Sequence, residues 1–343
     1  HLVRDLAFVV PNYDWWEAPF YGIGMKVYDM LAGKYGFGPS KILSKEETIG
    51  AIPTIEIEGL RGGVRYYDGQ FDDARLAMTL AHTAHQQGAT LINYCRVTGL
   101  LKRDDMVSGV RIEDVETGKS MEVRARAVIN STGPWTDGLR SMDDPQARPL
   151  IRPSQGVHVV LDRTFLPGDH AIMVPQTADG RVLFAIPWHD AVVVGTTDTP
   201  IDDLPLEPTA LPEEIDFILS HARDYLTRDP EPEDVRSVFV GIRPLVGAGD
   251  GSTAALSRDH TLQVSRSGLV TVTGGKWTTY RHMAEDVIDQ AATVAGLEHM
   301  SCHTRELRLH GYVESWSSFG HLWPYGADAE RIRQLADRRP ELA

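Results

Sequence analysis

Apolar residues recur at helical spacing in five stretches of the chain. Residues 15–31 are rich in aromatic side chains and take on this spacing in their later part, so they form either core or interface. Asp72 is placed to cap a second helix, and Gly88 is placed to end it. Three further helices are predicted at residues 212–226, 277–295 and 329–335. The helix 277–295 is expected to present one apolar face, made of Met283, Val287, Ile288 and Ala291.

Short apolar runs between these helices predict β-strands. They lie at residues 90–97, 107–115, 121–129, 157–161, 181–186, 191–195, 235–240 and 261–273. Residues 127–130 are almost wholly apolar and lead directly into the small residues 131–133. A strand that is buried on both faces and ends in this way typically delivers the chain to a ligand crevice. We therefore predict an α/β layer with an inserted β-meander, followed by a largely antiparallel sheet with a helix on it.

Charge and composition narrow the function classes. The 343 residues are 42% hydrophobic and 24% charged, which is typical of a globular protein, and the formal net charge is -14. A field of this sign repels polyphosphate, so we predict no nucleic acid partner. A few well-placed cations can still bind a small anion. No apolar run approaches the roughly 20 residues that span a bilayer, so we expect a soluble or membrane-peripheral chain.

Cysteine and histidine give no sign of a disulfide or a metal site. The two cysteines, Cys95 and Cys302, are far apart and lack C-x-x-C spacing, which fits a reducing cytosol. His82 and His85 stand at i, i+3 and could in principle share a metal ion. No third ligand is recognisable nearby, so we predict two histidines on a helix surface and no bound metal.

Three glycine-containing motifs are candidate ligand sites. Residues 131–133 allow a ligand to approach backbone N–H groups, although such turns are common after strands. In residues 241–245 a proline holds Arg243 extended, either to fix an anion or to form an interdomain salt bridge. Residues 273–281 pass from a strand through two glycines into a helix. The free N–H groups, the helix dipole and Lys276 together predict an anion site there.

Arg258 is a further cation within the motif set. It stands next to Asp259, and pairing with that carboxylate is the alternative to binding a substrate anion. A conventional dinucleotide fingerprint is missing, because Gly22-Ile23-Gly24 has neither a third glycine nor a preceding strand.

In this order the motifs resemble those of the FAD-dependent glycerol-3-phosphate dehydrogenases, which belong to the D-amino-acid-oxidase-like flavoprotein superfamily. The resemblance covers about residues 1–300, and its last two motifs together are rather specific to the family. It is carried by Asp68-Gly69-Gln70, Asp72-Asp73-Ala74-Arg75-Leu76, Ser131-Thr132-Gly133-Pro134-Trp135, Gln155-Gly156-Val157-His158, Ile186-Pro187-Trp188, Gly195-Thr196-Thr197-Asp198, Gly241-Ile242-Arg243-Pro244-Leu245, Ser257-Arg258-Asp259 and Gly274-Gly275-Lys276-Trp277-Thr278-Thr279-Tyr280-Arg281.

The resemblance implies an α/β plus α+β fold. A Rossmann-like FAD-binding domain of the glutathione-reductase and D-amino-acid-oxidase type is interleaved with a mostly antiparallel substrate domain. The implied parts are 1–66 in the substrate or cap domain, 67–150 in the FAD-binding domain with its meander, 151–272 mainly in the substrate domain, 273–300 in a returning FAD-domain helix, and 301–343 at the start of a C-terminal helical domain.

The resemblance also implies an activity, the oxidation of sn-glycerol 3-phosphate to dihydroxyacetone phosphate by hydride transfer to FAD. It places Arg258 and Lys276 on the substrate phosphate and Arg243 at the C2 oxygen. His158 is the candidate acid–base group, with a structural role as its alternative. The implied cofactor contacts are Val97, Thr132, Gly133, Gly274, Gly275, Lys276 and Thr278. Electrons are expected to pass to a quinone at the cytoplasmic face of a membrane, and a homodimer is possible.

Two departures from the family suggest a fragment. The family begins with a strand, a G-x-G-x-x-G turn and a helix, followed by an arginine-tyrosine segment, and this sequence starts beyond them. Its final residues resemble the opening of a C-terminal helical domain. We therefore expect the chain expressed alone to be poorly soluble and inactive, with little or no flavin. A family-type N-terminal segment is expected to restore all three properties.

Two other interpretations stay open. A glycerol-3-phosphate oxidase, which passes electrons to oxygen, would carry the same motifs, and oxygen uptake with peroxide formation would distinguish it. A non-catalytic ligand-binding fragment is an alternative from another class. Flavin bands in the absorption spectrum of the purified protein would argue against that alternative.

Overall fold

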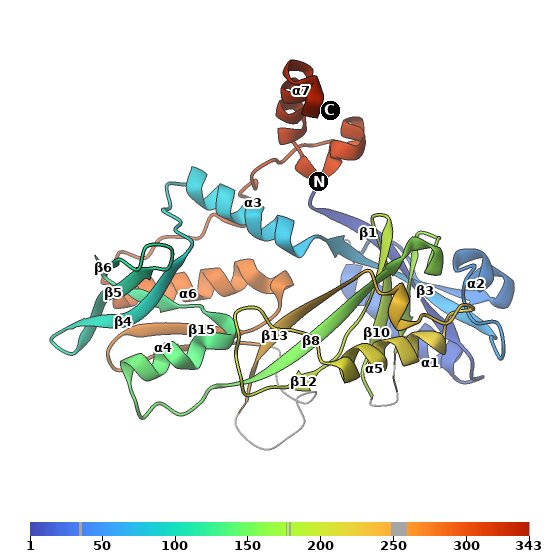
Figure 1. Cartoon of the computed structure of the whole chain (residues 1–343), viewed down its shortest axis with the longest axis horizontal. Helices are drawn as coiled ribbons and strands as arrows, with labels where there is room; N and C mark the ends of the chain where they lie inside the picture. The colour runs from blue at the N-terminus through green and yellow to red at the C-terminus, as the bar shows by residue number, and fades with distance from the viewer. Residues whose placement is uncertain (34–35, 176, 178–179, 248–258, 343) are drawn as a thin grey trace.

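The largest element of the fold is a nine-stranded, mostly antiparallel sheet. The computed structural model describes residues 1–33, 36–175, 177, 180–247 and 259–342, and within them the strand order is β12-β8-β11-β10-β9-β1-β3-β2, with β13 also paired to β8. The strands are β1 (Val3–Asn12), β2 (Lys41–Ser44), β3 (Gly62–Phe71), β8 (Ile151–Asp162), β9 (His170–Val174), β10 (Leu183–Trp188), β11 (Ala191–Gly195), β12 (Thr199–Pro200) and β13 (Ser237–Val246). The N-terminal strands thus lie beside strands from the middle of the chain (Figure 1).

The main core lies on one face of this sheet. Helices α2 (Lys45–Ala51) and α5 (Pro212–Arg223) pack on that face. Alternate residues of β8, among them Val159 and Leu161, are fully buried, as expected for a strand with one covered face. Ile218 of α5 is equally buried and belongs to the same cluster. The predicted antiparallel sheet with a helix on it is therefore confirmed.

A second, smaller sheet has three strands in the order β14-β15-β7. Its strands are β14 (His260–Val264), β15 (Leu269–Gly274) and β7 (Val128–Asn130), and helices α4 (Thr136–Asp143) and α6 (Tyr280–Val294) pack against it. β15 pairs with β7 in parallel. In α6, Val287 and Ala291 are buried, whereas Ile288 is 56% exposed. The predicted apolar face of this helix is thus only partly covered by the described chain.

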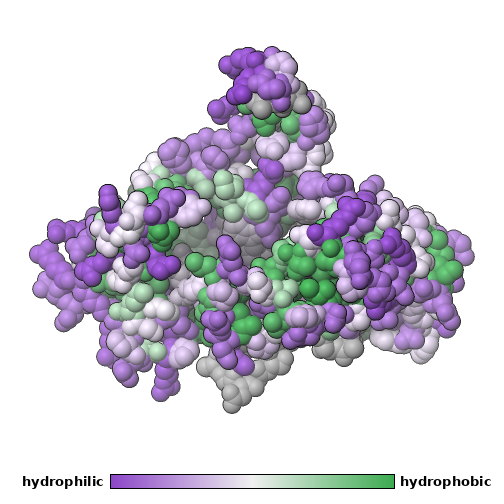
Figure 2. Space-filling view, in the orientation of Figure 1, coloured by the Kyte–Doolittle hydropathy of each residue, from purple (hydrophilic) through white to green (hydrophobic). Residues whose placement is uncertain are grey.

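The predicted β-meander forms a separate three-stranded sheet that follows helix α3. The elements are α3 (Asp73–Gln86), β4 (Cys95–Arg103), β5 (Met106–Asp114) and β6 (Ser120–Arg124). The carboxylate of Asp72 accepts a hydrogen bond from the backbone N–H of Arg75 at 2.9 Å, which confirms the predicted helix cap. Figure 2 shows mainly hydrophilic side chains over this meander and over α7, while hydrophobic ones gather over the middle of the nine-stranded sheet.

Two longer helices and several short ones complete the fold. They are α1 (Glu17–Ala32), α7 (Asp328–Arg338) and the short 3₁₀ helices η2 (Gly133–Trp135), η3 (Arg163–Phe165), η4 (Pro232–Asp234), η6 (Trp277–Thr279), η7 (Ser317–Tyr325) and η8 (Pro340–Leu342). In Figure 1, α7 stands away from the sheets, close to the N-terminus. A helix at residues 329–335 is therefore confirmed.

Three predicted strands begin late or are divided in two. Residues 90–94 are not in a strand, and β4 begins only at Cys95, since Leu91 and Ile92 are 50% and 63% exposed with no strand covering them in the described chain. The predicted strand 121–129 is divided into β6 and β7. The strand 261–273 is divided by a turn in which the N–H of Gly268 donates to the carbonyl of Ser265 at 3.0 Å.

Helix α1 decides between the two interpretations of the aromatic-rich segment. Its inner face packs on the sheet through Tyr21 and Met25. Its outer face exposes apolar side chains, with Phe20 at 63%, Ile23 at 69% and Met30 at 74% of their surface. The outer face is therefore a surface feature rather than core, and patches of this kind mark interaction sites.

Candidate active site

Arg243 lies inside β13, which continues beyond the predicted strand 235–240. It lies opposite Ser154 of β8, and β13 continues beyond it to Val246. The strand tolerates Pro244 because β13 pairs with β8 alone among the described strands, which leaves its other edge without ladder hydrogen bonds.

The loop between β11 and β12 fixes the guanidinium of Arg243. Its Nη1 donates to the carbonyl oxygen of Thr197 and its Nη2 to Oγ1 of Thr196, each at 3.0 Å. The Asp198 carboxylate lies 3.6 Å from Nη1, and Ser154 Oγ donates to that same carboxylate. Because these partners act on one planar fork, the orientation of the guanidinium is defined as well as its position.

Two glycines make room for the side chains at this place. A Cβ on Gly156 would overlap the guanidinium of Arg243, and a Cβ on Gly195 would overlap the ring of His158. No side chain larger than hydrogen fits at either position unless Arg243 or His158 moves. The two glycines therefore allow the close packing of these candidate residues against β8 and β11.

His158 is a half-buried neighbour of Arg243. Its ring stacks on Phe239 of β13 with 4.9 Å between the centroids and 6° between the planes. Burial, together with the positive charge of Arg243, lowers the pKa of His158 from 6.5 to about 4. At neutral pH the imidazole is therefore uncharged and has a nitrogen lone pair that can accept a proton.

The parallel strands β7 and β15 deliver their glycines to one edge of the small sheet. Leu269, Val270 and Thr271 of β15 pair with residues 128–130 of β7, so both strands end on the same side. At the end of β15, Gly274 has φ +76°, and beyond the two strands Gly275 has φ +78° and Gly133 has φ +57°, a region that favours glycine. The predicted glycine motifs of two distant segments therefore lie at one edge.

The two sheets meet next to this edge. A Cβ on Gly274 would lie 2.8 Å from Cγ2 of Val246, the last residue of β13. On the other side, the indole N–H of Trp135 donates to the carbonyl of Leu204 at 3.0 Å, which ties η2 to the chain after β12. Arg243 is three residues from Val246 on β13, so it belongs to the same junction.

Lys276 lies exposed between the glycines and η6. Its backbone is extended, with φ -119° and ψ 149°, and its carbonyl accepts a hydrogen bond from the N–H of Thr279 at 3.0 Å. A pocket of about 540 Å³ adjoins it, and the lining includes Ser131, Gly275 and apolar residues of α6 such as Val287. A cation thus stands at the mouth of an apolar pocket.

The positions of the other predicted residues give less information about the candidate site. Val97 pairs with Ile112 in the meander, and Thr278 lies exposed in η6. Arg258 lies outside the described residues. His82 stacks on His310, with 4.9 Å between the ring centroids. Within the described part of the chain, no group of three potential ligands from histidine, cysteine, aspartate and glutamate could hold a metal ion.

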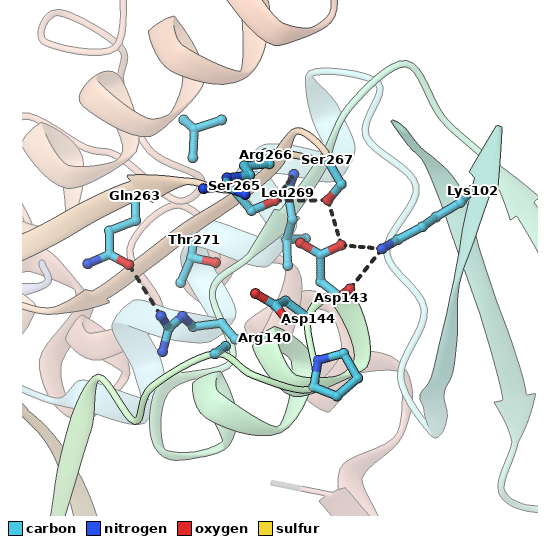
Figure 3. A pocket seen from close by; sticks show the side chains of 13 residues that line it. Lys102, Arg140, Asp143, Asp144, Gln263, Ser265, Arg266, Ser267, Leu269 and Thr271 are labelled. Atoms are coloured by element: carbon cyan, nitrogen blue, oxygen red, sulfur yellow. Dashed lines mark hydrogen bonds and ion pairs between the residues drawn. The ribbon is translucent and has the colours of Figure 1, made fainter. Parts of the chain in front are cut away.

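A larger pocket, of about 610 Å³, lies at the opposite end of the small sheet (Figure 3). The Lys102 ammonium lies 2.8 Å from the buried carboxylate of Asp143, and Ser267 donates to that carboxylate at 2.5 Å. The pocket lies beside the turn between β14 and β15, whereas the glycine edge lies where β15 ends. The pocket is therefore separate from the glycine edge. Its polar groups are largely paired with each other.

The sequence matches the family model described as FAD dependent oxidoreductase over residues 18–281. This match covers most of the chain, including the Arg243 loop and the glycine edge. The chain belongs to this family. Its mixed α/β architecture with a large, mostly antiparallel sheet is the fold of these FAD-dependent oxidoreductases.

Curated relatives of the chain carry a common name. Over 348 residues the chain is 42% identical to "Glycerol-3-phosphate dehydrogenase, mitochondrial" of Macaca fascicularis. This match covers 98% of the present chain and 48% of the Macaca protein. The Schizosaccharomyces pombe protein of the same name is 39% identical over 93% of this chain and 53% of its own length. The chain spans about half the length of the curated relatives it matches.

Solved structures agree in fold. The glycerol-3-phosphate dehydrogenase of Bacillus halodurans complexed with FAD matches with a TM-score of 0.77 and 29% identity, over 98% of this chain and 62% of that one. An L-alpha-glycerophosphate oxidase from Mycoplasma pneumoniae matches with a TM-score of 0.64 and 17% identity, over 88% of this chain and 75% of that one. The second likeness concerns the fold alone.

The residues at the glycine edge fit FAD. A Cβ on Gly133 would meet no atom within 4 Å, so space is open beside its backbone. The apolar pocket next to Gly275 has a volume within the usual range of about 300–1,000 Å³ for small-molecule sites. The open space beside the Gly133 backbone and the apolar wall of the pocket suit a planar ring with a polar rim.

Sequence reasoning assigned no role to several residues that build the site. Gly156, Gly195, Thr196 and Thr197 stand in motifs that carry the family resemblance, and the motifs themselves are the signal. Glu214 gave a weaker signal, an acidic residue in the first turn of a helix after a proline. Only the tertiary contacts connect Glu214 to Arg243.

Proposed function

We propose that the chain carries the substrate side of an enzyme that oxidises sn-glycerol 3-phosphate to dihydroxyacetone phosphate and passes electrons through FAD to a quinone. The observation that carries this proposal is the fixed guanidinium of Arg243 beside the uncharged His158, at the junction with the glycine edge. The names of the curated relatives support the choice of substrate.

Arg243 and His158 divide the chemistry at C2 in this proposal. The guanidinium faces the C2 oxygen and stabilises the negative charge that develops as the hydroxyl proton leaves. His158 accepts that proton. It can do so because its lowered pKa keeps the imidazole deprotonated at neutral pH. Bound FAD would supply the hydride acceptor.

Cofactor and phosphate contacts come from the glycine edge. We assign the FAD contacts to Thr132, Gly133, Gly274, Gly275, Lys276 and Thr278, with Val97 as the predicted contact from the meander. Lys276 and Arg258 bind the substrate phosphate, and the exposed ammonium beside the backbone turn at Gly275 supports the role of Lys276.

Absorption and turnover test the proposal together. A purified preparation that carries a family-type N-terminal segment should show flavin bands. It should also reduce an artificial electron-accepting dye when glycerol 3-phosphate is added. Rapid oxygen uptake with peroxide formation would instead support the oxidase alternative. A preparation without flavin, even when it carries a family-type N-terminal segment, would support the non-catalytic alternative.

The outer face of α1 supports association with a membrane surface. No helix in the described part of the chain is long and apolar enough to cross a bilayer. The exposed apolar residues of α1 include Phe20, Ile23 and Val27, and Trp15 before the helix is 77% exposed, a side chain that favours the interfacial region. We propose that this face contacts the membrane on its cytoplasmic side, close to the quinone.

Flotation with phosphatidylcholine vesicles tests this contact. A variant with Phe20→Ser and Ile23→Ser should lose binding while keeping dye-linked activity. A chain that does not bind vesicles but is dimeric until these residues are changed would place the surface in a homodimer instead.

A further inference from the structure

Glu214 is a buried carboxylate that no step of the proposed mechanism uses. It lies in the first turn of α5 with 3% of its surface exposed. Its Oε2 accepts hydrogen bonds from Gln155 Nε2 at 2.7 Å and from the N–H of Leu211 at 2.9 Å. Its Oε1 accepts from the hydroxyls of Thr199 at 2.6 Å and Thr197 at 3.2 Å. Four donors therefore fill the acceptor positions of the carboxylate.

Two donors of Glu214, Thr197 and Thr199, lie inside and directly after the loop that holds Arg243. Thr197 and Thr199 flank Asp198, and Gln155 belongs to β8. The Thr197 hydroxyl also accepts a hydrogen bond from the N–H of Val157 at 2.9 Å, so it links α5 to β8 through one buried oxygen. The carbonyl of the same Thr197 accepts from Arg243.

We propose that Glu214 and Thr197 are positioning residues, which hold the loop between β11 and β12 so that its oxygens fix the guanidinium of Arg243. This inference rests on the proposed function for its kinetic consequence. A capping carboxylate that served α5 alone would need only the N–H of Leu211 and would have no reason to engage two threonines and a glutamine. The buried network is fully satisfied, and such networks define one arrangement of their members.

Thr197→Val tests the inference with little change of volume. The variant keeps the carbonyl that accepts from Arg243 but loses the hydroxyl that fixes it. In an active preparation we expect kcat to fall about tenfold while KM stays within about twofold, since the affected interaction serves the developing charge. Thr197→Ser keeps the hydroxyl and should retain kcat. Val160→Thr, an exchange of similar size on β8 away from the loop, is the control for general disturbance.

A double-mutant cycle separates positioning from plain destabilisation. If Thr197 acts through Arg243, Thr197→Val should change kcat little in a protein that already carries Arg243→Lys. Additive losses in the two variants, or equal kcat for wild type and Thr197→Val, would overturn the inference.

The titration of His158 gives a readout that does not depend on turnover. In Thr197→Val the charge of Arg243 is less firmly held beside the imidazole, so the pKa of His158, measured by NMR, should rise above its wild-type value. An unchanged pKa would overturn the inference. If the wild-type preparation does not oxidise glycerol 3-phosphate, the proposed function fails, and the His158 titration alone decides whether Thr197 positions Arg243.

Discussion

The nine-stranded sheet and the three-stranded sheet β14-β15-β7 contribute to the candidate site in different ways. The first presents side chains, Arg243 and His158, on strands that have a large buried core behind them. The second presents backbone at Gly133, Gly274 and Gly275, over a cluster of only four buried residues. Reactive groups need fixed side-chain orientations, whereas a cofactor can be held by N–H groups that any residue with the right backbone supplies.

The largest expected effect tests the unequal cores. Leu161→Ala in β8 removes a fully buried side chain and should lower the free energy of unfolding by about 2–5 kcal/mol. Val287→Ala in α6 removes two methyl groups beside the smaller cluster and should cost about 1.6 kcal/mol. Denaturant unfolding of both variants checks the order. Equal losses would mean that the small sheet is supported as firmly as the large one.

Arg243→Lys tests whether the large sheet supplies the chemistry. The charge remains but the planar fork is lost, so kcat should fall by about 10²–10³, as for the loss of an oxyanion donor. Steady-state kinetics with glycerol 3-phosphate measures this. Arg236→Lys is the matched control, because Arg236 is exposed just before β13 and pairs with Asp162. Near-normal turnover of the Arg243 variant would indicate that this residue forms a structural ion pair and takes no part in the chemistry.

Gly133→Ala tests whether the small sheet contributes through its backbone. The positive φ should cost about 1–2 kcal/mol, and the new methyl group would stand where the backbone is open to a ligand. We expect the flavin content to fall. Gly118→Ala has a similar φ of +69° and equally open surroundings in the meander, so it should cost the same stability and leave the flavin content unchanged. Equal flavin loss in both variants would contradict the assignment.

Lys276→Gln tests the exposed cation next to the glycine edge of the small sheet. Removal of an exposed charge from the substrate phosphate should raise KM about tenfold and change kcat and flavin content far less, because such binding is largely uniform. Lys119→Gln, on the exposed turn of the meander, should change none of these values. Unchanged kinetics in the Lys276 variant would remove it from the phosphate site.

A further prediction concerns pH. Since the pKa of His158 is lowered to about 4, the unfolded chain binds more protons at this residue than the folded chain between about pH 6.5 and 4. Stability should therefore fall as the pH drops through this window, and His158→Asn should reduce the loss. Unfolding midpoints at pH 7 and pH 5 check this. An equal acid loss in the variant would indicate that His158 titrates normally.

The sequence alone predicted most of the secondary structure and the motifs. The capped helix after Asp72 and the meander follow from local signals that the tertiary structure leaves intact. The strand predicted at residues 90–97 begins only at Cys95, because an apolar run becomes a strand only where another strand pairs with it. Pairing partners lie far away along the chain and have no local signal.

The residue types of the site were likewise determined by the sequence, and their mutual arrangement by the tertiary structure. Arg243 and the glycine motifs were recognisable from their residue types and from their order along the sequence. The sheet register that places Arg243 opposite Ser154, and the contact of Glu214 with Thr197, depend on segments 89 and 17 residues apart in sequence. Hydrogen-bond geometry across such separations is set by packing, and composition and periodicity carry no information about it.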